Sequence, residues 1–329
     1  MHKTIYGQCT IHLEIKATSS ILVQKRVAEG AKSMATFFMA YDPKRGREFP
    51  CIPGSSLKGV LRSACEKIMR SFHPQLSCDP LKTEPEQPGY SCSTEITTRM
   101  QSGELAPQQA YGALCPACRL FGCTAHAGLI TLEDAWLQEE LRPETRTGIA
   151  IDRFTGGVKL GKGGKRGALY AYKPIPDNSR FSTTMMIANF ELWHIGLLAL
   201  VFREISKGNI LLGGGKRRGL GQATVQVQEL RFNYPVRLYP SGDKRPGAIC
   251  SAQLLIPEER RAKNSYPPDQ IWLGQGLVPQ QSTSWRDAAW VHYVLTDQRW
   301  IESIFQECVE RALAPRLKAG PSGFYAQGG

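Results

Sequence analysis

Hydrophobic side chains in residues 49–72 recur at intervals of three and four positions. This spacing places them along one side of a helix and leaves the polar residues on the other side. The segment therefore predicts an amphipathic helix packed on a core, preceded by a turn at Pro53 and Gly54, with Ser55 or Ser56 as the N-cap. The apolar stripe consists of Leu57, Val60, Leu61, Ala64, Cys65, Ile68, Met69 and Phe72.

Strand patterns precede and follow this helix. Residues 5–15 alternate apolar and polar positions, with Cys9, Ile11, Leu13 and Ile15 on one face, and residues 223–230 alternate in the same way. Both segments predict strands, and residues 129–132 predict a shorter one. Residues 190–205 are apolar on nearly every side, which predicts a second helix buried against the sheet.

Two segments lack a clear period. Residues 17–48 predict a long connection that ends in a turn at 42–46, and the proline-rich residues 71–109 predict an insertion. Residues 285–313 contain enough spaced apolar positions for one or two helices. We expect the last ten residues to be disordered.

Composition is ordinary for a globular protein, but the charge is not. The 329 residues are 42% hydrophobic and carry a net charge of +12. We find no apolar run of membrane-spanning length and no signal-peptide pattern, and so expect a cytoplasmic protein without a membrane partner. Residues 152–221 hold twelve Lys or Arg against four Asp or Glu. Such clustering is typical of proteins that bind a nucleic-acid backbone.

The start of the first predicted helix has the features of an anion site. Its unpaired N–H groups and the helix dipole favour a negative ligand, and Ser55, Ser56 and Lys58 add hydroxyl groups and charge, with Arg62 one turn further on. The alternative is a capped amphipathic helix whose lysine is only solvated. This segment alone does not decide between them.

Residues 146–174 predict a protruding hairpin. Two extended arms flank a tip in which basic residues alternate with glycines. Glycine leaves the backbone bare and lysine supplies charge, so such a tip can approach a phosphate closely; a solvated loop is the alternative. The basic residues of the tip are Lys159, Lys162, Lys165 and Arg166.

A second glycine-rich segment, residues 213–221, contains Lys216, Arg217 and Arg218 in succession. Its composition cannot fill a core, and it predicts a loop that wraps a phosphate. It follows a helix, precedes a strand and lacks the Lys-Ser/Thr pair of a P-loop, which argues against mononucleotide binding.

Ten cysteines without a secretion signal favour thiols or metal over disulfides. Cys115 and Cys118 have the spacing of a zinc knuckle, and two further cysteines lie in the proline-rich insertion. This pattern predicts a structural zinc site on Cys78, Cys92, Cys115 and Cys118, with His73 and Cys123 as alternative ligands. The other cysteines have apolar neighbours and are expected in the core: Cys9, Cys51, Cys65, Cys250 and Cys308.

Four motifs, in this order, resemble those of one known family. They are Ile-Pro-Gly-Ser-Ser-Leu-Lys-Gly-Val-Leu-Arg at 52–62, Cys-Arg-Leu-Phe-Gly at 118–122, Gly-Ile-Ala-Ile-Asp-Arg-Phe-Thr-Gly at 148–156 and the glycine-rich loop at 213–221. Together they resemble the RAMP superfamily, and most closely the repeated backbone subunits of type III CRISPR effector complexes. The resemblance covers about residues 5–231.

The resemblance implies an α+β fold: a modified ferredoxin-like (RRM-like) palm with inserted zinc-bearing fingers and a thumb β-hairpin. The core would span residues 1–231, with the insertion at about 71–118 and the thumb at about 152–180. Residues 232–329 would be a C-terminal extension packed on that core.

The resemblance also implies a function. Such subunits stack along a guide RNA (crRNA), recognise target RNA in antiviral defence, and assemble with other RAMP subunits and a large subunit. Ser55, Ser56, Lys58 and Arg62 would contact guide phosphates, the glycine-rich loop would line the same groove, and thumbs, here including Arg153, would kink the guide–target duplex.

Cleavage of target RNA in this family depends on an aspartate that falls near Thr36 in this sequence, where no acid stands. We therefore expect a scaffold, with Asp42 the best remaining catalytic candidate and a divalent metal needed only if the chain cuts. Two alternatives stay open: a target-cleaving subunit of the same complex, and a stand-alone single-stranded RNA-binding protein. A repeat-cleaving ribonuclease would need a histidine near the basic loops, and none of the six lies there.

Overall fold

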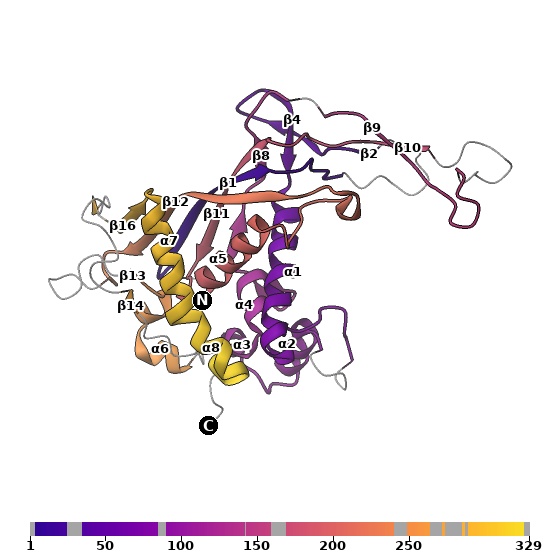
Figure 1. Ribbon diagram of the computed structural model, residues 1–329. Helices are drawn as coiled ribbons and strands as arrows, with labels where there is room; N and C mark the ends of the chain where they lie inside the picture. Colours follow the sequence, from indigo (N-terminus) through magenta and orange to yellow (C-terminus); the bar gives the residue numbers. More distant parts are fainter. Residues whose placement is uncertain are drawn as a thin grey trace.

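The computed structural model describes residues 4–24, 35–84, 90–141, 143–158, 169–239, 249–263, 272–273, 285–286 and 289–325. A large antiparallel sheet forms one layer, and helices α1 (Gly54–Phe72), α5 (Leu192–Ser206) and α7 (Gln298–Glu307) lie against one face of it (Figure 1). None of the helices in the described parts of the chain is long and apolar enough to cross a membrane.

The main sheet has nine strands in the order β15-β16-β12-β1-β11-β8-β4-β3, with β7 pairing beside β8 on β11. The strand pairs in it are antiparallel. The strands are β1 (Gln8–Ala17), β3 (Met39–Asp42), β4 (Arg47–Ile52), β7 (Ile130–Leu132), β8 (Ala135–Leu137), β11 (Arg180–Ala188), β12 (Ala223–Pro235), β15 (Trp285–Arg286) and β16 (Trp290–Leu295).

Connectivity at the centre of the sheet is that of a β-α-β-β-α-β unit. In chain order the unit consists of β1, α1, β7 with β8, β11, α5 and β12, and its strands lie side by side as β12-β1-β11-β8. The fold is therefore α+β and compatible with the ferredoxin-like palm that the family resemblance implies.

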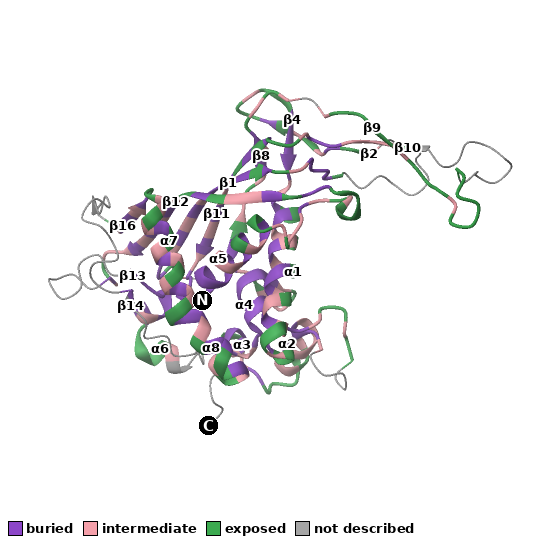
Figure 2. Ribbon diagram, in the orientation of Figure 1, coloured by how far each residue is buried: buried purple, intermediate pink, exposed green. Residues whose placement is uncertain are grey.

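Periodicity explains how these elements pack. Cys9, Ile11 and Leu13 of β1 are buried, whereas the alternate residues are only partly covered, so the helices cover one face of the sheet. Most of the predicted stripe of α1 is buried as well, but Phe72 is 56% exposed at the end of the helix. Figure 2 shows that burial is concentrated between the sheet and the helices.

The insertion after α1 contains more helix than the sequence predicted. It comprises η1 (Pro74–Leu76), α2 (Cys92–Gln101), η2 (Pro107–Gln109), α3 (Ala110–Ala113), α4 (Pro116–Phe121) and the small pair β5 (Gly122–Cys123) and β6 (His126–Ala127). Helix α2 has no clear period because Cys92 and Ile96 are its only buried residues. These two belong to a small core separate from the main one.

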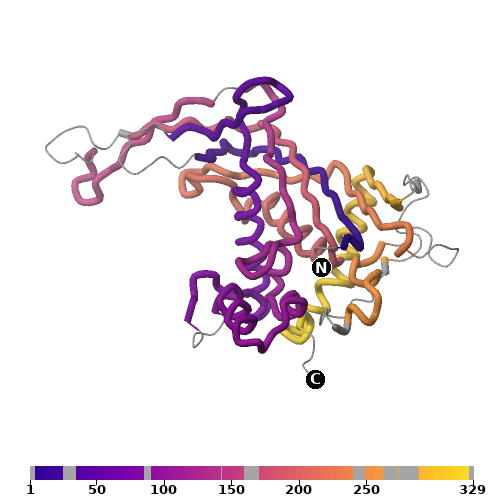
Figure 3. The backbone as a smooth tube through the Cα atoms, turned by 180° about the vertical axis from the view of Figure 1, so that it is seen from behind, coloured from indigo at the N-terminus to yellow at the C-terminus, as the bar shows by residue number. Residues whose placement is uncertain are grey.

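The hairpin that the sequence predicted is present. Strand β9 (Arg146–Ile149) pairs antiparallel with β10 (Leu169–Lys173), and β2 (Ala35–Thr36) pairs parallel with β10. This arm extends from the body on the same side as the insertion, as the views from the front and from behind both show (Figures 1 and 3). The tip residues Lys159, Lys162, Lys165 and Arg166 lie outside the described residues.

The C-terminal part is continuous with the main sheet. Strand β12 runs past residue 231 to Pro235, and residues 290–295, which we expected within a helical segment, form β16 beside it. The other elements are β13 (Ile249–Cys250), η4 (Ala252–Leu255), α6 (Glu258–Lys263), β14 (Trp272–Leu273), the π-helix η5 (Cys308–Leu313), α8 (Ala314–Ala319) and η6 (Gly320–Gly323).

The structure describes residues 320–325 of the last ten residues. Phe324 is fully buried and packs edge-on against Trp193 at 5.2 Å between ring centroids. Residues 326–329 lie outside the described part.

Candidate nucleic-acid interface and metal site

Helix α1 begins at Gly54, two residues earlier than an N-cap at Ser55 would place it. Pro53 is the N-cap and makes no side-chain cap, and the N–H of Gly54 donates to the Asp134 carboxylate at 2.7 Å. The predicted serine cap is therefore wrong: an acid from the turn after β7 supplies the negative charge that a helix start favours. Ser55 and Ser56 lie in the first turn with exposed side chains.

Gly54 is required by this contact. A Cβ on Gly54 would lie 2.3 Å from the carbonyl oxygen of Leu132, so only glycine allows the helix to approach the β7–β8 turn so closely. The start of α1 is thus held against the sheet by backbone packing, and its outer side is left open.

Lys58 and Arg62 face into the protein. Lys58 Nζ donates to the carbonyl of Ile130 at 3.0 Å, and burial, with the charge of Arg62, lowers the pKa of this lysine. The guanidinium of Arg62 donates to Glu66 and to the carbonyl of Gly122, each at 2.8 Å, and to Cys118 Sγ at 3.5 Å. Arg62 therefore contacts the cysteine cluster, and its donors are used within the chain.

The open side of α1 borders a groove of about 690 Å³ between this helix and the segment after α5. Lys67 and Lys216 bring positive charge to it from the two walls. Small and hydroxylated residues on α1 leave the helix backbone accessible. The lining residues are Ser56, Gly59, Val60, Ser63, Ala64, Lys67, Ile68, Ser71, Glu204, Asn209, Ile210, Leu211 and Lys216.

The glycine-rich loop forms the second wall, and its glycines have structural roles. Gly213 has φ of 73°, and a Cβ there would lie 2.4 Å from the Leu22 carbonyl oxygen; Gly214 N–H donates to the same carbonyl at 2.7 Å. Gly215 and Gly219 adopt left-handed conformations on either side of η3 (Lys216–Arg218). The loop is held against residues 20–22, which presents three exposed basic side chains from a fixed backbone.

Arg218 connects this loop to the arm formed by β2, β9 and β10, which corresponds to the predicted thumb and is called the thumb below. Its guanidinium lies 4.5 Å from the centre of the Tyr170 ring, a cation–π contact between η3 and β10. Strand β10 and the η3 loop, whose residues Tyr170 and Arg218 are 48 positions apart in the chain, are therefore adjacent in space.

The thumb carries exposed apolar side chains beyond its base. Phe154 is 100% exposed, and Ile149, Ile151 and Val158 are each more than half exposed. The Asp152 carboxylate accepts from the N–H groups of Phe154 and Thr155, at 2.9 and 3.0 Å, and so fixes the turn that presents Phe154. Arg153, predicted to bind RNA, is exposed in the same turn.

The Asp42 side chain forms hydrogen bonds within the hairpin between β3 and β4. Its carboxylate accepts from the Arg45 guanidinium and from the Lys44 N–H at 2.8 Å, and only 3% of the residue is exposed. The hydrogen bond from Arg45 is the main cause of its lowered pKa. Thr36, where the family aspartate would fall, is exposed on β2 beside Lys173 of the thumb.

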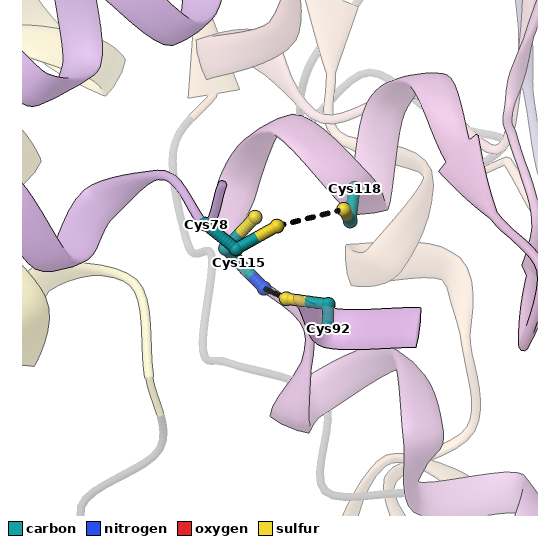
Figure 4. A group of neighbouring side chains, drawn as sticks. All are labelled: Cys78, Cys92, Cys115 and Cys118. Atoms are coloured by element: carbon teal, nitrogen blue, oxygen red, sulfur yellow. Dashed lines mark hydrogen bonds between the residues drawn. The ribbon is translucent and has the colours of Figure 1, made fainter. Parts of the chain in front are cut away.

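The four predicted cysteine ligands do come together. The sulfurs of Cys78, Cys92, Cys115 and Cys118 all lie within 4.8 Å of one another, and all four residues are buried (Figure 4). The Cys78 and Cys118 sulfurs are 3.6 Å apart. Sulfur atoms on a tetrahedral zinc, each bonded at about 2.3 Å, are separated by just under 4 Å, so the cluster fits a Cys₄ zinc site.

The alternative ligands are placed differently. His73 Nδ1 accepts from the Gln75 N–H at 3.2 Å at the end of α1. Cys123 is half-buried next to the cluster, where a hydrogen bond with Cys118 lowers its pKa. Neither His73 nor Cys123 belongs to the group of four neighbouring ligand atoms. The Arg62 guanidinium on Cys118 would offset part of the negative charge that four thiolates bring to one metal.

The remaining cysteines are buried as predicted, and His194 is a core residue. No histidine is among the groove-lining residues in the described parts of the chain. The sequence reading missed Ser63, Lys67 and Tyr170. Ser63 and Lys67 are four residues apart on the helix face next to the apolar stripe, a signal that could have found them. Tyr170 offered no such signal.

Comparison with known protein families matches residues 39–224 to the RAMP superfamily. Because the match covers more than half of the 329 residues, the chain belongs to this superfamily. The RAMP domain marks it in general terms as a CRISPR-associated, RNA-binding protein. A search of curated proteins finds no match.

Proposed function

We propose that this chain is a guide-RNA (crRNA) binding backbone subunit of a type III CRISPR–Cas ribonucleoprotein that recognises target RNA in antiviral defence. The observation that carries the proposal is the groove along α1, which lies beside the basic η3 loop and next to the base of a projecting thumb. A sugar–phosphate backbone needs positive charge and close approach rather than a deep pocket.

Within this proposal the exposed side of α1 binds the sugar–phosphate backbone of the guide RNA. Ser56, Ser63 and Lys67 offer hydroxyl and ammonium donors along one helix face, and Lys216 lines the opposite wall of the groove. Arg217 is exposed next to Lys216 in the loop. Lys58 supports the helix through Ile130, and we assign Arg62 to the cysteine cluster instead of to RNA.

The thumb fits the role of a wedge. Its apolar residues, led by Phe154, are exposed beyond the contact between Tyr170 and Arg218, and such exposure is costly unless a partner covers them. A guide–target duplex offers base pairs against which such side chains can stack. Other RAMP subunits and a large subunit would complete the assembly.

We further propose a scaffold role for this subunit. The Asp42 carboxylate is occupied by Arg45 and Lys44 within a turn, and Thr36 carries no ionisable group. Structural zinc, held by the four cysteines, would add stability to the small core of the insertion. The zinc would have no direct part in RNA binding.

The test is the salt dependence of RNA binding by the full chain. Single-stranded RNAs of unrelated sequence should bind alike, and Lys67→Ala/Lys216→Ala should lower affinity for all of them. Losing two phosphate contacts should reduce the slope of log K against log salt by about 1.4. Arg299→Ala/Lys318→Ala, which removes the same charge from α7 and α8, is the matched control. Equal loss in both double variants would overturn the assignment of the groove.

A further inference from the structure

Two tyrosines lie along one face of the thumb strand β10. The rings of Tyr170 and Tyr172 are 6.2 Å apart between centroids and inclined by 24°, a near-parallel stack of residues two positions apart. Arg218 from the η3 loop lies over Tyr170 at 4.5 Å. The result is a continuous row of three flat groups at the junction of loop and thumb.

A glycine on the neighbouring strand makes room for this row. Gly148 of β9 is directly opposite Tyr170 in the register, and a Cβ on Gly148 would lie 2.3 Å from Tyr170 Cζ. The tyrosine ring thus lies across the β9 backbone at the only place where no side chain stands in its way. Any other residue at 148 would displace the ring, so its orientation is built into the hairpin.

The row is open to solvent at one end. Arg218 is exposed, and Tyr170 is 37% exposed despite its contact with the guanidinium. Proteins bind single-stranded nucleic acids through such surfaces, because every base has a flat face that stacks on an aromatic ring or a guanidinium plane. The phosphate groove begins beside it at Lys216, two residues from Arg218.

We propose that Arg218 and Tyr170, supported by Tyr172 and Gly148, form a stacking platform for one unpaired base of a bound RNA. The base binds to the platform at the point where the RNA strand passes from the groove to the thumb. It is indifferent to base identity, because stacking uses the face of the base and not its hydrogen-bonding edge. This proposal rests on the proposed RNA-binding function.

The test uses the full chain and single-stranded RNAs that carry 2-aminopurine at successive positions. A stacked 2-aminopurine loses fluorescence, so one position should be quenched on binding to the wild-type protein. Tyr170→Phe keeps the ring and should keep the quenching. Tyr170→Leu keeps an apolar side chain without a ring and should lose the quenching. The affinity of the Tyr170→Leu variant for RNA should fall roughly tenfold. The slope of log K against log salt should stay unchanged.

Two controls separate stacking from a purely structural contact between loop and thumb. A melting temperature for Tyr170→Leu equal to that of Tyr170→Phe shows that the fold is intact. Arg218→Lys keeps the charge but loses the planar group, so it should reduce quenching without changing the salt slope.

The outcomes are distinguishable. RNA binding with quenching that persists in Tyr170→Leu overturns the platform and leaves the proposed function standing. A loss of affinity accompanied by a changed salt slope in Tyr170→Leu also overturns the platform, because it shows that phosphate contacts were disturbed. Failure of the wild-type chain to bind any RNA overturns both proposals.

Discussion

The Arg119 guanidinium donates a hydrogen bond of 2.7 Å to the carbonyl of Phe324, 205 residues further along the chain. Its other nitrogens donate to the carbonyls of Leu114 and Gly112, at 3.0 and 2.8 Å, and the arginine is fully buried. Arg119 directly follows Cys118 on α4. One residue therefore ties the cysteine-bearing insertion to the C-terminal turn.

A fully buried glutamate lies in the same region of the core. Glu191 accepts hydrogen bonds from the Tyr111 hydroxyl and from Trp193 Nε1, the latter at 2.8 Å, and so joins the insertion to the start of α5. Burial, together with the charges of Arg119 and Arg316, lowers the pKa of neighbouring His194, which keeps this imidazole neutral. The insertion, α5 and the C-terminal turn are therefore expected to unfold together.

Replacing Arg119 with Met should destabilise the protein by about 3 kcal/mol, because buried carbonyls would be left without a donor. Urea denaturation should show a lower midpoint with an unchanged slope. Arg299→Met, on the exposed surface of α7, should leave the midpoint nearly unchanged. Equal midpoints for Arg119→Met and the wild type would contradict this account.

Purified protein should contain about one zinc ion per chain, held by the four cysteines. Cys115→Ser should lower the zinc content and the melting temperature together, since the metal would supply stability that the small core of the insertion cannot. Cys65→Ser is the matched control: this cysteine is equally buried but lies in α1 outside the cluster, so zinc should be retained. A stable wild-type protein without metal would refute the site.

Asp42→Ala should leave the pattern of target-RNA cuts unchanged in a reconstituted complex, since the carboxylate is bound within the β3–β4 turn. The readout is the ladder of RNA fragments on a gel. A missing band with guide and target affinity intact would show that Asp42 is catalytic. Thr36→Asp, which restores an acid at the family position, tests the complementary case by the gain of a band.

The structural role of Asp42 has its own pH signature. Its pKa is lowered in the folded state, so the stability it provides is present above its unfolded value of about 3.9 and is lost as the pH falls through the folded pKa. Asp42→Asn should therefore be less stable than the wild type at neutral pH, and the difference should shrink in acid. Melting temperatures of both proteins, measured from neutral to acid pH, give this difference in stability. A difference that grows in acid would contradict the structural role of Asp42.

Local periodicity was enough to predict the framework. The stripe of α1, the alternation of β1 and the apolar helix α5 are properties of consecutive residues, because each period matches one backbone geometry. The thiol site was also predictable in outline, since Cys115 and Cys118 lie one helical turn apart and the insertion had too little apolar surface to fold alone. The geometry then selected Cys78 and Cys92 over His73 and Cys123.

The direction of individual side chains was decided only by the tertiary structure. Lys58 and Arg62 read as an anion site, yet the packing of α1 turns them towards Ile130 and Cys118. Asp134, 80 residues away, took the capping role that the sequence offered to Ser55 or Ser56. Such contacts join residues that are distant in the chain, and no local period encodes them.

The same reason explains the two contacts that shape the proposals made above. Tyr170 meets Arg218, and Phe324 meets Arg119, only after the sheet has brought the thumb, the η3 loop, the insertion and the C-terminus to their places. The sequence alone determined the main helices, strands and basic loop of the palm, because those depend on neighbours in the chain. Which of these segments touch depends on how they pack around the sheet, and that was decided by the fold.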